Sequence, residues 1–198
     1  MAEDLRAVYE AEAAGFDRDR NRSLIERKWL DPFLALVPAG APVLDIGCGA
    51  GEPIARYLTE KGHPVTGVDF ATAMLAIARA RFPQAEWLEA DMRTLDLDRR
   101  FGGIVAWDSF FHLTRDEQRA VVPVFARHLL PGGALLFTCG PADGEATGAV
   151  GGRPVHHASL SPAGCATLLE ANGFAVRAFI AEDTACAGHS VWLARRQP

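Results

Sequence analysis

Residues 43–52 read Val-Leu-Asp-Ile-Gly-Cys-Gly-Ala-Gly-Glu, an apolar run that passes directly into a glycine-rich loop. The first four of these residues predict a short buried strand, and a helix is expected from about Pro53. Gly47, Gly49 and Gly51 permit positive φ angles and carry no Cβ, so a ligand can lie directly against the backbone of the loop. The stretch therefore predicts a binding loop at the carboxyl end of a buried strand, where open α/β sheets bind their ligands.

Downstream of this loop, short apolar runs alternate with helical patterns, which predicts a mostly parallel α/β sheet with helices on both faces. The last two runs are joined by about ten residues without a helical pattern, which favours an antiparallel strand at the end of the sheet. We expect a single domain over residues 1–198, with an N-terminal helical cap at 1–38 and a core at 39–198. A glycine-rich excursion at 140–154 is expected to be flexible. The predicted strands lie near 43–46, 65–68, 86–88, 103–107, 134–138, 174–180 and 190–195.

Composition excludes several classes of protein. The chain has 20 Lys and Arg against 25 Asp and Glu, a net charge of −5, which disfavours binding to nucleic acid. Its sequence contains no apolar run long enough for a membrane span, and its acidic start does not resemble a secretory signal. The four cysteines form no C-x-x-C pair, so we expect reduced thiols in a cytoplasmic protein and no metal site. Its oligomeric state is left open.

Three acids follow or precede the predicted ligand loop. Asp69 ends the second predicted strand, where a carboxylate can accept hydrogen bonds from both hydroxyls of a ribose. Asp91 follows the third strand, at a place suited to the exocyclic amine of adenine. Asp45 precedes the loop, where a carboxylate is unfavourable beside a pyrophosphate and favourable beside an amino-bearing ligand. The third glycine, Gly51, is also one position too early for the dinucleotide fingerprint. That fingerprint needs a glycine at position 52, where this chain has Glu52.

Four segments resemble, in order and spacing, the motifs of class I S-adenosylmethionine-dependent methyltransferases. They are residues 43–52, 67–70, 89–92 and 130–136, and the resemblance covers roughly residues 40–198. It implies a Rossmann-like, seven-stranded sheet with an antiparallel last strand. It also implies transfer of a methyl group from S-adenosylmethionine to an oxygen or nitrogen of a small-molecule acceptor, with S-adenosylhomocysteine as product. The alternatives are a methyltransferase acting on RNA or protein, and an NAD(P)-dependent oxidoreductase.

The resemblance also implies roles for individual residues along the cofactor. Asp45 would lie beside the methionine amino group, Asp69 would bind the ribose hydroxyls, and Asp91 would meet the adenine amine. The remaining expected cofactor contacts are Gly47, Cys48, Gly49, Gly51, Phe70, Met74, Met92 and Trp107. In relatives, an aromatic residue or an arginine of the N-terminal helix reaches the methionine carboxylate, for which this chain offers Tyr9, Phe16, Arg18 and Arg22.

The acceptor side is expected after the fourth strand, in the segment Asp108–Leu113. His112 could take a proton from the acceptor near neutral pH, or it could hold the loop by bonding to a backbone carbonyl. Asp108 could likewise contact the acceptor or orient the loop. Four further side chains are candidates for the acceptor pocket, although packing would explain the aromatic ones equally well: Trp29, Phe110, Phe111 and His156.

Overall fold

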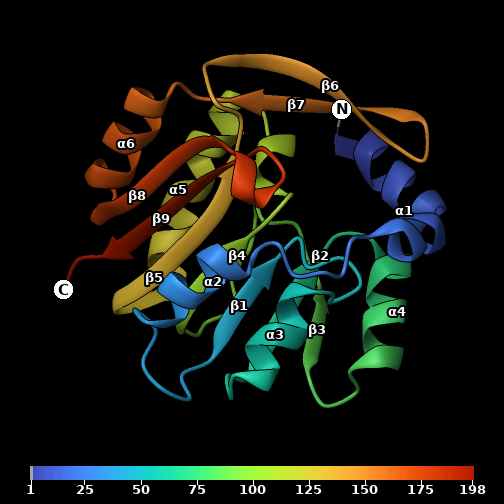
Figure 1. Cartoon of the computed structure of the whole chain (residues 1–198), viewed down its shortest axis with the longest axis horizontal. Coiled ribbons are helices and arrows are strands. Elements are labelled where there is room, and N and C mark those ends of the chain that lie inside the picture. The colour runs from blue at the N-terminus through green and yellow to red at the C-terminus, as the bar shows by residue number, and fades with distance from the viewer. Residues whose placement is uncertain (1) are drawn as a thin grey trace.

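The computed structural model describes residues 2–198, with side chains from residue 5 onward. Two helices, α1 (Ala2–Asp19) and α2 (Arg27–Leu34), come before the first strand. The core then alternates strands and helices in the predicted order (Figure 1). Its elements are β1 (Val43–Ile46), α3 (Ile54–Glu60), β2 (Val65–Asp69), α4 (Thr72–Arg81), β3 (Glu86–Glu89), β4 (Phe101–Ala106), the 3-10 helix η1 (Phe110–His112), α5 (Arg115–His128), β5 (Leu129–Cys139), β6 (Gly144–Val150), β7 (Arg153–Ser159), α6 (Pro162–Ala171), β8 (Phe174–Asp183), the 3-10 helix η2 (Thr184–Cys186) and β9 (His189–Arg196).

The main sheet has seven strands in the order β3-β2-β1-β4-β5-β9-β8. Neighbouring strands from β3 to β5 in this order pair in parallel, and β9 pairs antiparallel with both β5 and β8. The expected fold class and the antiparallel last strand are therefore confirmed. The expectation that the antiparallel strand forms the end of the sheet is wrong, because β9 lies between β5 and β8 and leaves β8 at the edge.

Helices cover both faces of the sheet, so β1 and β4 are buried throughout. On one face, α5 and α6 contribute to a core cluster that includes Val121, Phe125 and Leu169. On the other face, α2, α3 and α4 contribute to a second cluster that includes Phe33 and Leu58. The sheet is thus the middle layer, and its carboxyl edge is left for the loops that follow each strand.

The N-terminal cap expected at residues 1–38 contains two helices with a break between them. Helix α1 ends at Asp19, and a turn over residues 20–26 leads into α2. Within this turn Leu24 has a φ of 58°, and Glu26 is fully buried. The break directs the end of α1 over the carboxyl edge of the sheet instead of along its face.

The glycine-rich excursion is an ordered β-hairpin rather than a flexible loop. Strands β6 and β7 pair antiparallel from Gly144 opposite Ser159 to Val150 opposite Arg153. The turn between them consists of Gly151 and Gly152, whose φ angles are 56° and 79°. A tight two-residue hairpin turn requires two successive positive φ angles of this kind. Figure 1 shows the hairpin running over the carboxyl edge of the sheet toward α1, where Val150 packs with Val8.

In the part of the chain that the structure describes, no helix is both long and apolar enough to cross a membrane.

Candidate functional site

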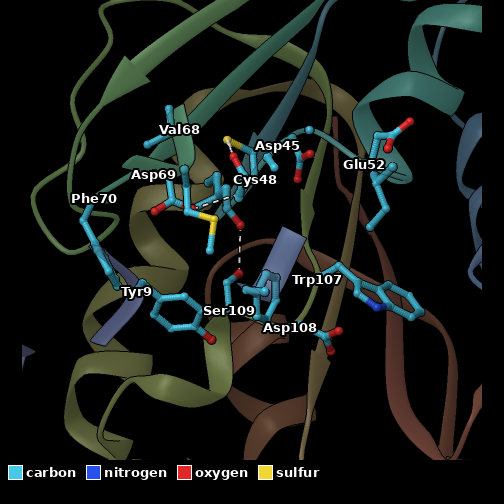
Figure 2. A pocket seen from close by; sticks show the side chains of 18 of the residues that line it. Tyr9, Asp45, Cys48, Glu52, Val68, Asp69, Phe70, Trp107, Asp108 and Ser109 are labelled. Atoms are coloured by element: carbon cyan, nitrogen blue, oxygen red, sulfur yellow. Dashed lines mark hydrogen bonds between the residues drawn. The ribbon is translucent and has the colours of Figure 1, made fainter. Parts of the chain in front are cut away.

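A cavity lies at the carboxyl ends of β1, β2 and β4, beneath α1. We call it the central cavity. Figure 2 shows Asp45, Asp69 and Tyr9 facing it from three different elements. Its lining comprises Tyr9, Phe16, Asp17, Arg20, Asp45, Ile46, Gly47, Cys48, Gly49, Ala50, Gly51, Glu52, Ile54, Val68, Asp69, Phe70, Met74, Ala90, Met92, Trp107, Asp108, Ser109 and His112.

The glycine loop forms one wall of the central cavity. The amides of Gly47 and Cys48 both donate to the carbonyl of Val68, at 2.7 and 3.1 Å, which ties the loop to the end of β2. Gly47 has a φ of 70°, and a Cβ there would lie 2.3 Å from the Cβ of Ser109. Gly49 has a φ of 52°, with no heavy atom outside its immediate chain neighbours within 4 Å of where its Cβ would be. The loop therefore needs glycine at 47 for packing, whereas Gly49 leaves space open.

The Asp69 carboxylate is held at the end of β2 by the backbone on both sides. Its Oδ2 accepts from the Gly49 amide at 2.9 Å, and its Oδ1 accepts from the Ala71 amide at 2.8 Å. Burial raises the pKa of Asp69, and the bonds from these amides oppose that rise. The glycine loop and Asp69 are thus one hydrogen-bonded unit.

The central cavity is rich in acids. Asp45 is only 3% exposed, and its pKa is raised to about 7 because burial disfavours the charge and Asp69 lies nearby. Among the described lining residues, five carboxylates face one guanidinium, that of Arg20. The five are Asp17, Asp45, Glu52, Asp69 and Asp108. Asp17 and Glu52 are paired with arginines outside the lining, so the other three carboxylates supply the negative charge that favours a cationic ligand and disfavours a pyrophosphate.

Arg20 is the cavity residue that sequence reasoning missed. It follows α1, and its Nη2 bonds Oε1 of the buried Glu26 at 2.8 Å while its Nη1 lies 3.6 Å from Asp108. The charge run that contains it looks like a solvated surface, which hid it. A usable signal was its spacing of four from Phe16 and eleven from Tyr9, which keeps all three on one helical face.

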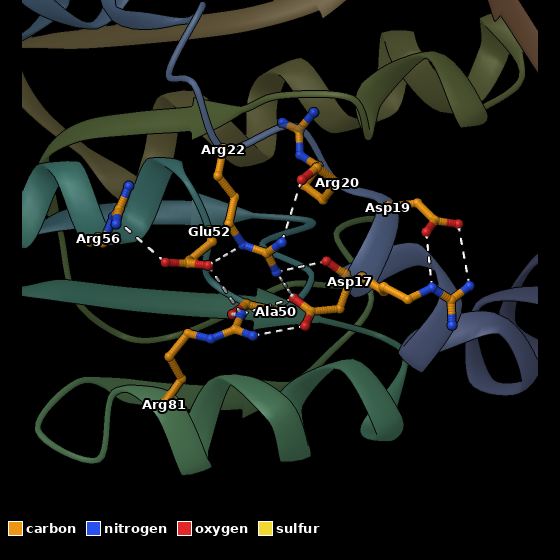
Figure 3. A network of polar contacts seen from close by, with 9 residues as sticks. Asp17, Asp19, Arg20, Arg22, Ala50, Glu52, Arg56 and Arg81 are labelled. Carbon is orange, nitrogen blue, oxygen red and sulfur yellow. Dashed lines mark hydrogen bonds and ion pairs between the residues drawn. The ribbon is translucent and has the colours of Figure 1, made fainter.

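The two arginines proposed from sequence have other partners, and Figure 3 shows those of Arg22. Arg18 is exposed and pairs with Asp19, although it also lines the rim outside the central cavity. Arg22 bonds Asp17 and Glu52, and the same two acids take Arg81 as a second partner. This network ties the end of α1 to the glycine loop and to α4. Tyr9 and Phe16, the two aromatic candidates, do line the central cavity.

The adenine-side candidates divide into two groups. Phe70, Met74 and Met92 line the central cavity. Asp91 does not, and lines a neighbouring hollow that also has Phe70 and Met92 in its wall. Its carboxylate accepts from Nε of Arg93 at 2.9 Å. Burial alone would raise the pKa of Asp91, but the bonds from Arg93 hold it below its usual value.

Trp29 and Phe110 pack into the core, which is the packing alternative that the sequence left open for them. Trp29 is 4% exposed, and its Nε1 donates to Oδ2 of Asp183 at 2.9 Å. Phe110 is 1% exposed and packs against Phe137, with ring centroids 5.0 Å apart. Both rings face the hydrophobic core because their positions in α2 and η1 direct them toward the sheet. Neither borders any cavity described here.

His112 lies on the cavity wall with both ring nitrogens engaged. Its Nδ1 is 3.2 Å from the carbonyl oxygen of His156, and its Nε2 is 2.9 Å from the hydroxyl of Tyr9. A carbonyl can only accept, so Nδ1 donates and Nε2 accepts from Tyr9. Burial lowers the pKa of His112 to about 4, which keeps the ring neutral. The His156 side chain itself lines the hollow beside Asp91.

Asp108 is hydrogen-bonded to His189 at the rim of the central cavity. Its Oδ1 lies 2.9 Å from Nε2 of His189, whose Nδ1 is 2.7 Å from the carbonyl oxygen of Cys186. Both ring nitrogens of His189 therefore face acceptors, and the hydrogen bond to Asp108 raises the pKa of His189. Trp107 lies against this imidazole, with ring centroids 5.4 Å apart.

Two further hollows open beside the rim at Asp108. The outer hollow lies between α1 and the β6–β7 hairpin, and the hairpin hollow lies between that hairpin and the start of β9. Asp108, Phe111 and His157 border both hollows. In the described chain, no three His, Cys, Asp or Glu side chains are grouped so as to hold a metal ion.

A family model for a methyltransferase domain matches residues 43–133, the segment that carries the glycine loop, Asp69 and Asp91. Over these residues the chain is similar to methyltransferase domains. Over 101 residues it is 38% identical to a dTDP-3-amino-3,6-dideoxy-alpha-D-glucopyranose N,N-dimethyltransferase of Streptomyces fradiae, a match that covers 50% of this chain and 39% of that protein.

Two other similarities agree with this family. Over 140 residues the chain is 34% identical to a malonyl-acyl-carrier-protein O-methyltransferase of Enterobacter lignolyticus, covering 68% of this chain and 55% of the relative. The chain thus spans less than two thirds of either curated relative. Among solved structures, CalS10, an amino pentose methyltransferase from Micromonospora echinaspora, is 23% identical with a TM-score of 0.75, covering 94% of this chain and 96% of that one. That likeness shows the same fold.

Proposed function

We propose that this chain binds S-adenosylmethionine in the central cavity and transfers its methyl group to a nitrogen or oxygen of a small molecule. The observation that carries the proposal is the acidic cavity itself, in which the glycine loop, Asp45 and Asp69 meet at the end of β1 and β2. A cationic, amino-bearing ligand with a ribose matches this set of groups, and a dinucleotide does not. The match to methyltransferase relatives supports the same conclusion.

Each cavity residue then has a role that its position supports. Asp45 faces the ligand's amino group, Asp69 accepts from the ribose hydroxyls, and Gly49 leaves room for the ligand at the loop. We place Arg20 beside the ligand's carboxylate, because it is the guanidinium of the described lining. The aromatic and thioether side chains that enclose the adenine are Phe70, Met74 and Met92.

The bound sulfonium supplies an electrophilic methyl group, and the chain supplies position and shielding from water. We propose that residues 1–38 form a cap over the core at 39–198, since Tyr9 and Phe16 of α1 roof the central cavity. The acceptor then enters past Asp108 and His112, which border both the central cavity and the outer hollow.

The acceptor class that we favour is a small molecule with an amino group. Carboxylates of Asp108, Glu145 and Glu182 line the hairpin hollow, and carboxylates attract a protonated amine. The relative from Streptomyces fradiae is named for an amino sugar, which is consistent with this chemistry. The experiment below therefore compares an acceptor that has an amino group with one that has a hydroxyl group.

The experiment is transfer of tritiated methyl from S-adenosylmethionine across a panel of acceptors. The panel contains dTDP-3-amino-3,6-dideoxyglucose, the corresponding 3-hydroxy sugar nucleotide, total RNA and denatured protein. We expect label in a small-molecule acceptor, with the amino sugar ahead of its hydroxyl counterpart. Label confined to RNA or protein would contradict the proposed acceptor class, and saturable binding of NADH without binding of S-adenosylhomocysteine would contradict the proposed cofactor.

A further inference from the structure

His157 of β7 stands where the two acceptor-side hollows meet. Its side chain lines both the outer hollow and the hairpin hollow, together with Phe111 and Asp108. Its ring centroid lies 4.5 Å from that of Phe111 and 4.9 Å from that of His112, so it packs against a ring that lines the central cavity. Any acceptor that approaches the cavity from the hairpin side passes this imidazole.

The ring of His157 is held by packing and not by hydrogen bonds. Among the described residues, neither of its nitrogens has a hydrogen-bond partner, and the side chain is half-buried. The backbone of Gly148 on β6 lies directly beneath it, and a Cβ at that position would come 2.4 Å from Cε1 and 2.6 Å from Nε2 of the ring. Glycine at 148 therefore makes the space that the imidazole occupies.

The other titratable groups at this rim are already engaged. Both nitrogens of His112 are used, by the hydroxyl of Tyr9 and the carbonyl of His156. Asp108 is paired with His189 and Arg20. Of the groups that border both hollows, His157 is thus the imidazole whose nitrogen can accept a proton without breaking an existing bond.

Resting on the methyltransferase function proposed above, we infer that His157 is the general base for the acceptor. Its neutral nitrogen takes a proton from the acceptor's ammonium or hydroxyl group. The freed lone pair forms the bond to the methyl carbon, the carbon–sulfur bond breaks, and its electron pair stays on the sulfur of S-adenosylhomocysteine. The imidazolium then returns the proton to solvent through the open hollow, so charge and protons balance.

The electrostatic surroundings keep this imidazole neutral before the reaction. Burial and the neighbouring His156 lower the pKa of His157, and the charge of Asp108 opposes them. Its ring also faces His112, which is neutral for the reason given above. Besides Asp108 and His112, the charged or titratable side chains around His157 in the two hollows are Tyr9, Glu12, Arg18, Asp19 and Arg20 from α1 and its end, Cys139 from β5, Glu145 from β6, and Glu182 and His189 from the end of the sheet.

The test compares wild type, His157→Gln, Gly148→Ala and the control Arg153→Gln, which alters an exposed residue of the same strand. With S-adenosylmethionine and dTDP-3-amino-3,6-dideoxyglucose as the probe, H157Q should lower kcat by about 100-fold or more. Its affinity for S-adenosylhomocysteine should stay within about twofold of wild type, and the acid limb of its pH profile should disappear. G148A should lower kcat because its Cβ displaces the ring, and R153Q should match wild type. An H157Q enzyme with wild-type kcat and an unchanged pH profile overturns the inference.

A second measurement separates this inference from the choice of acceptor. Modification by diethyl pyrocarbonate, followed by peptide mass mapping, reads the availability of each imidazole nitrogen without any acceptor. We expect His157 to react about tenfold faster than His112, whose nitrogens are both bonded, and bound S-adenosylhomocysteine to leave this order unchanged. Protection of His157 equal to that of His112 overturns the inference, whereas binding of S-adenosylhomocysteine without any methyl transfer to the probe counts against the acceptor class alone.

Discussion

The hydroxyl of Tyr9 lies 2.9 Å from Nε2 of His112, and this contact joins α1 to the segment that follows β4. The same ring of Tyr9 packs edge-on against Phe16 and Phe70, so it closes the central cavity from above. Burial raises the pKa of Tyr9, which keeps the hydroxyl protonated and able to donate. One hydrogen bond between uncharged groups therefore links Tyr9 of α1, above the central cavity, to His112 on the cavity wall.

Tyr9→Phe should remove this bond and keep the ring packing. We expect the free energy of unfolding in urea to fall by about 1 kcal/mol, the usual contribution of one hydrogen bond. A double-mutant cycle with His112→Phe should show a coupling of about 1 kcal/mol between the two sites. Additive effects, within about 0.3 kcal/mol, would show that the two side chains do not interact.

Gly49→Ala should separate ligand binding from folding. The φ of Gly49 is 52°, so alanine there costs about 1–2 kcal/mol of backbone strain, and its Cβ would project where no heavy atom of the chain beyond its immediate neighbours lies within 4 Å. Gly62→Ala is the matched control, because its φ is 85°, its Cβ position is equally open and it lies in the turn after α3. Both variants should lose similar stability in urea, but only G49A should bind S-adenosylhomocysteine at least about tenfold more weakly. Equal affinities for the two variants would contradict the placement of the ligand against Gly49.

Arg20→Met should destabilise the protein because it removes the charge partner of a buried carboxylate. Glu26 is fully buried and relies on Arg20 for its charge partner, so we expect a loss of about 3 kcal/mol in the free energy of unfolding. Adding Glu26→Gln should recover most of that loss, because the unpaired charge is then gone. Arg18→Met, at a side chain that is 73% exposed, should change stability by less than about 0.5 kcal/mol. A double variant no more stable than R20M would argue against this pairing.

Ligand binding should release a proton from Asp45. Its pKa is raised to about 7, so at pH 6 most free molecules carry the neutral acid, and the ligand's ammonium favours the ionised form. Affinity for S-adenosylhomocysteine should therefore rise about fivefold from pH 6 to pH 7 and level off above about pH 8, where Asp45 is already ionised in the free protein. Calorimetry in buffers of different ionisation enthalpy measures the proton release directly. Asp45→Asn should show no release and a flat profile over this range, and a wild type that behaves the same would refute the role of Asp45.

Much of this architecture could be predicted from local sequence patterns. The glycine loop, the acid at position 69 and the alternation of strands and helices depend on neighbours within about 20 residues, and the structure places them as expected. The capping box that begins α5, with Thr114 and Glu117, is likewise a local feature. These elements follow from chain geometry and burial, which periodicity records.

Features that depend on distant packing could not be predicted. Arg20 looks like one charge in a solvated run until the turn after α1 brings it over the cavity. Trp29 and Phe110 look like lid residues until the core surrounds them. His157 looks equivalent to His156, and only the register of the β6–β7 hairpin directs one ring onto Gly148 and the other toward the hollow beside Asp91. In each case the deciding partner is far away in the sequence.

The central claim is that Asp69 and the glycine loop bind the cofactor, and calorimetry with S-adenosylhomocysteine tests it most directly. Wild type and Asp69→Asn should be compared with Asp96→Asn, an exposed acid, with circular dichroism confirming that all three are folded. We predict saturable one-to-one binding by wild type and D96N, and at least about a tenfold loss of affinity in D69N. Absence of binding by folded wild type, or equal affinity in D69N, would contradict the account.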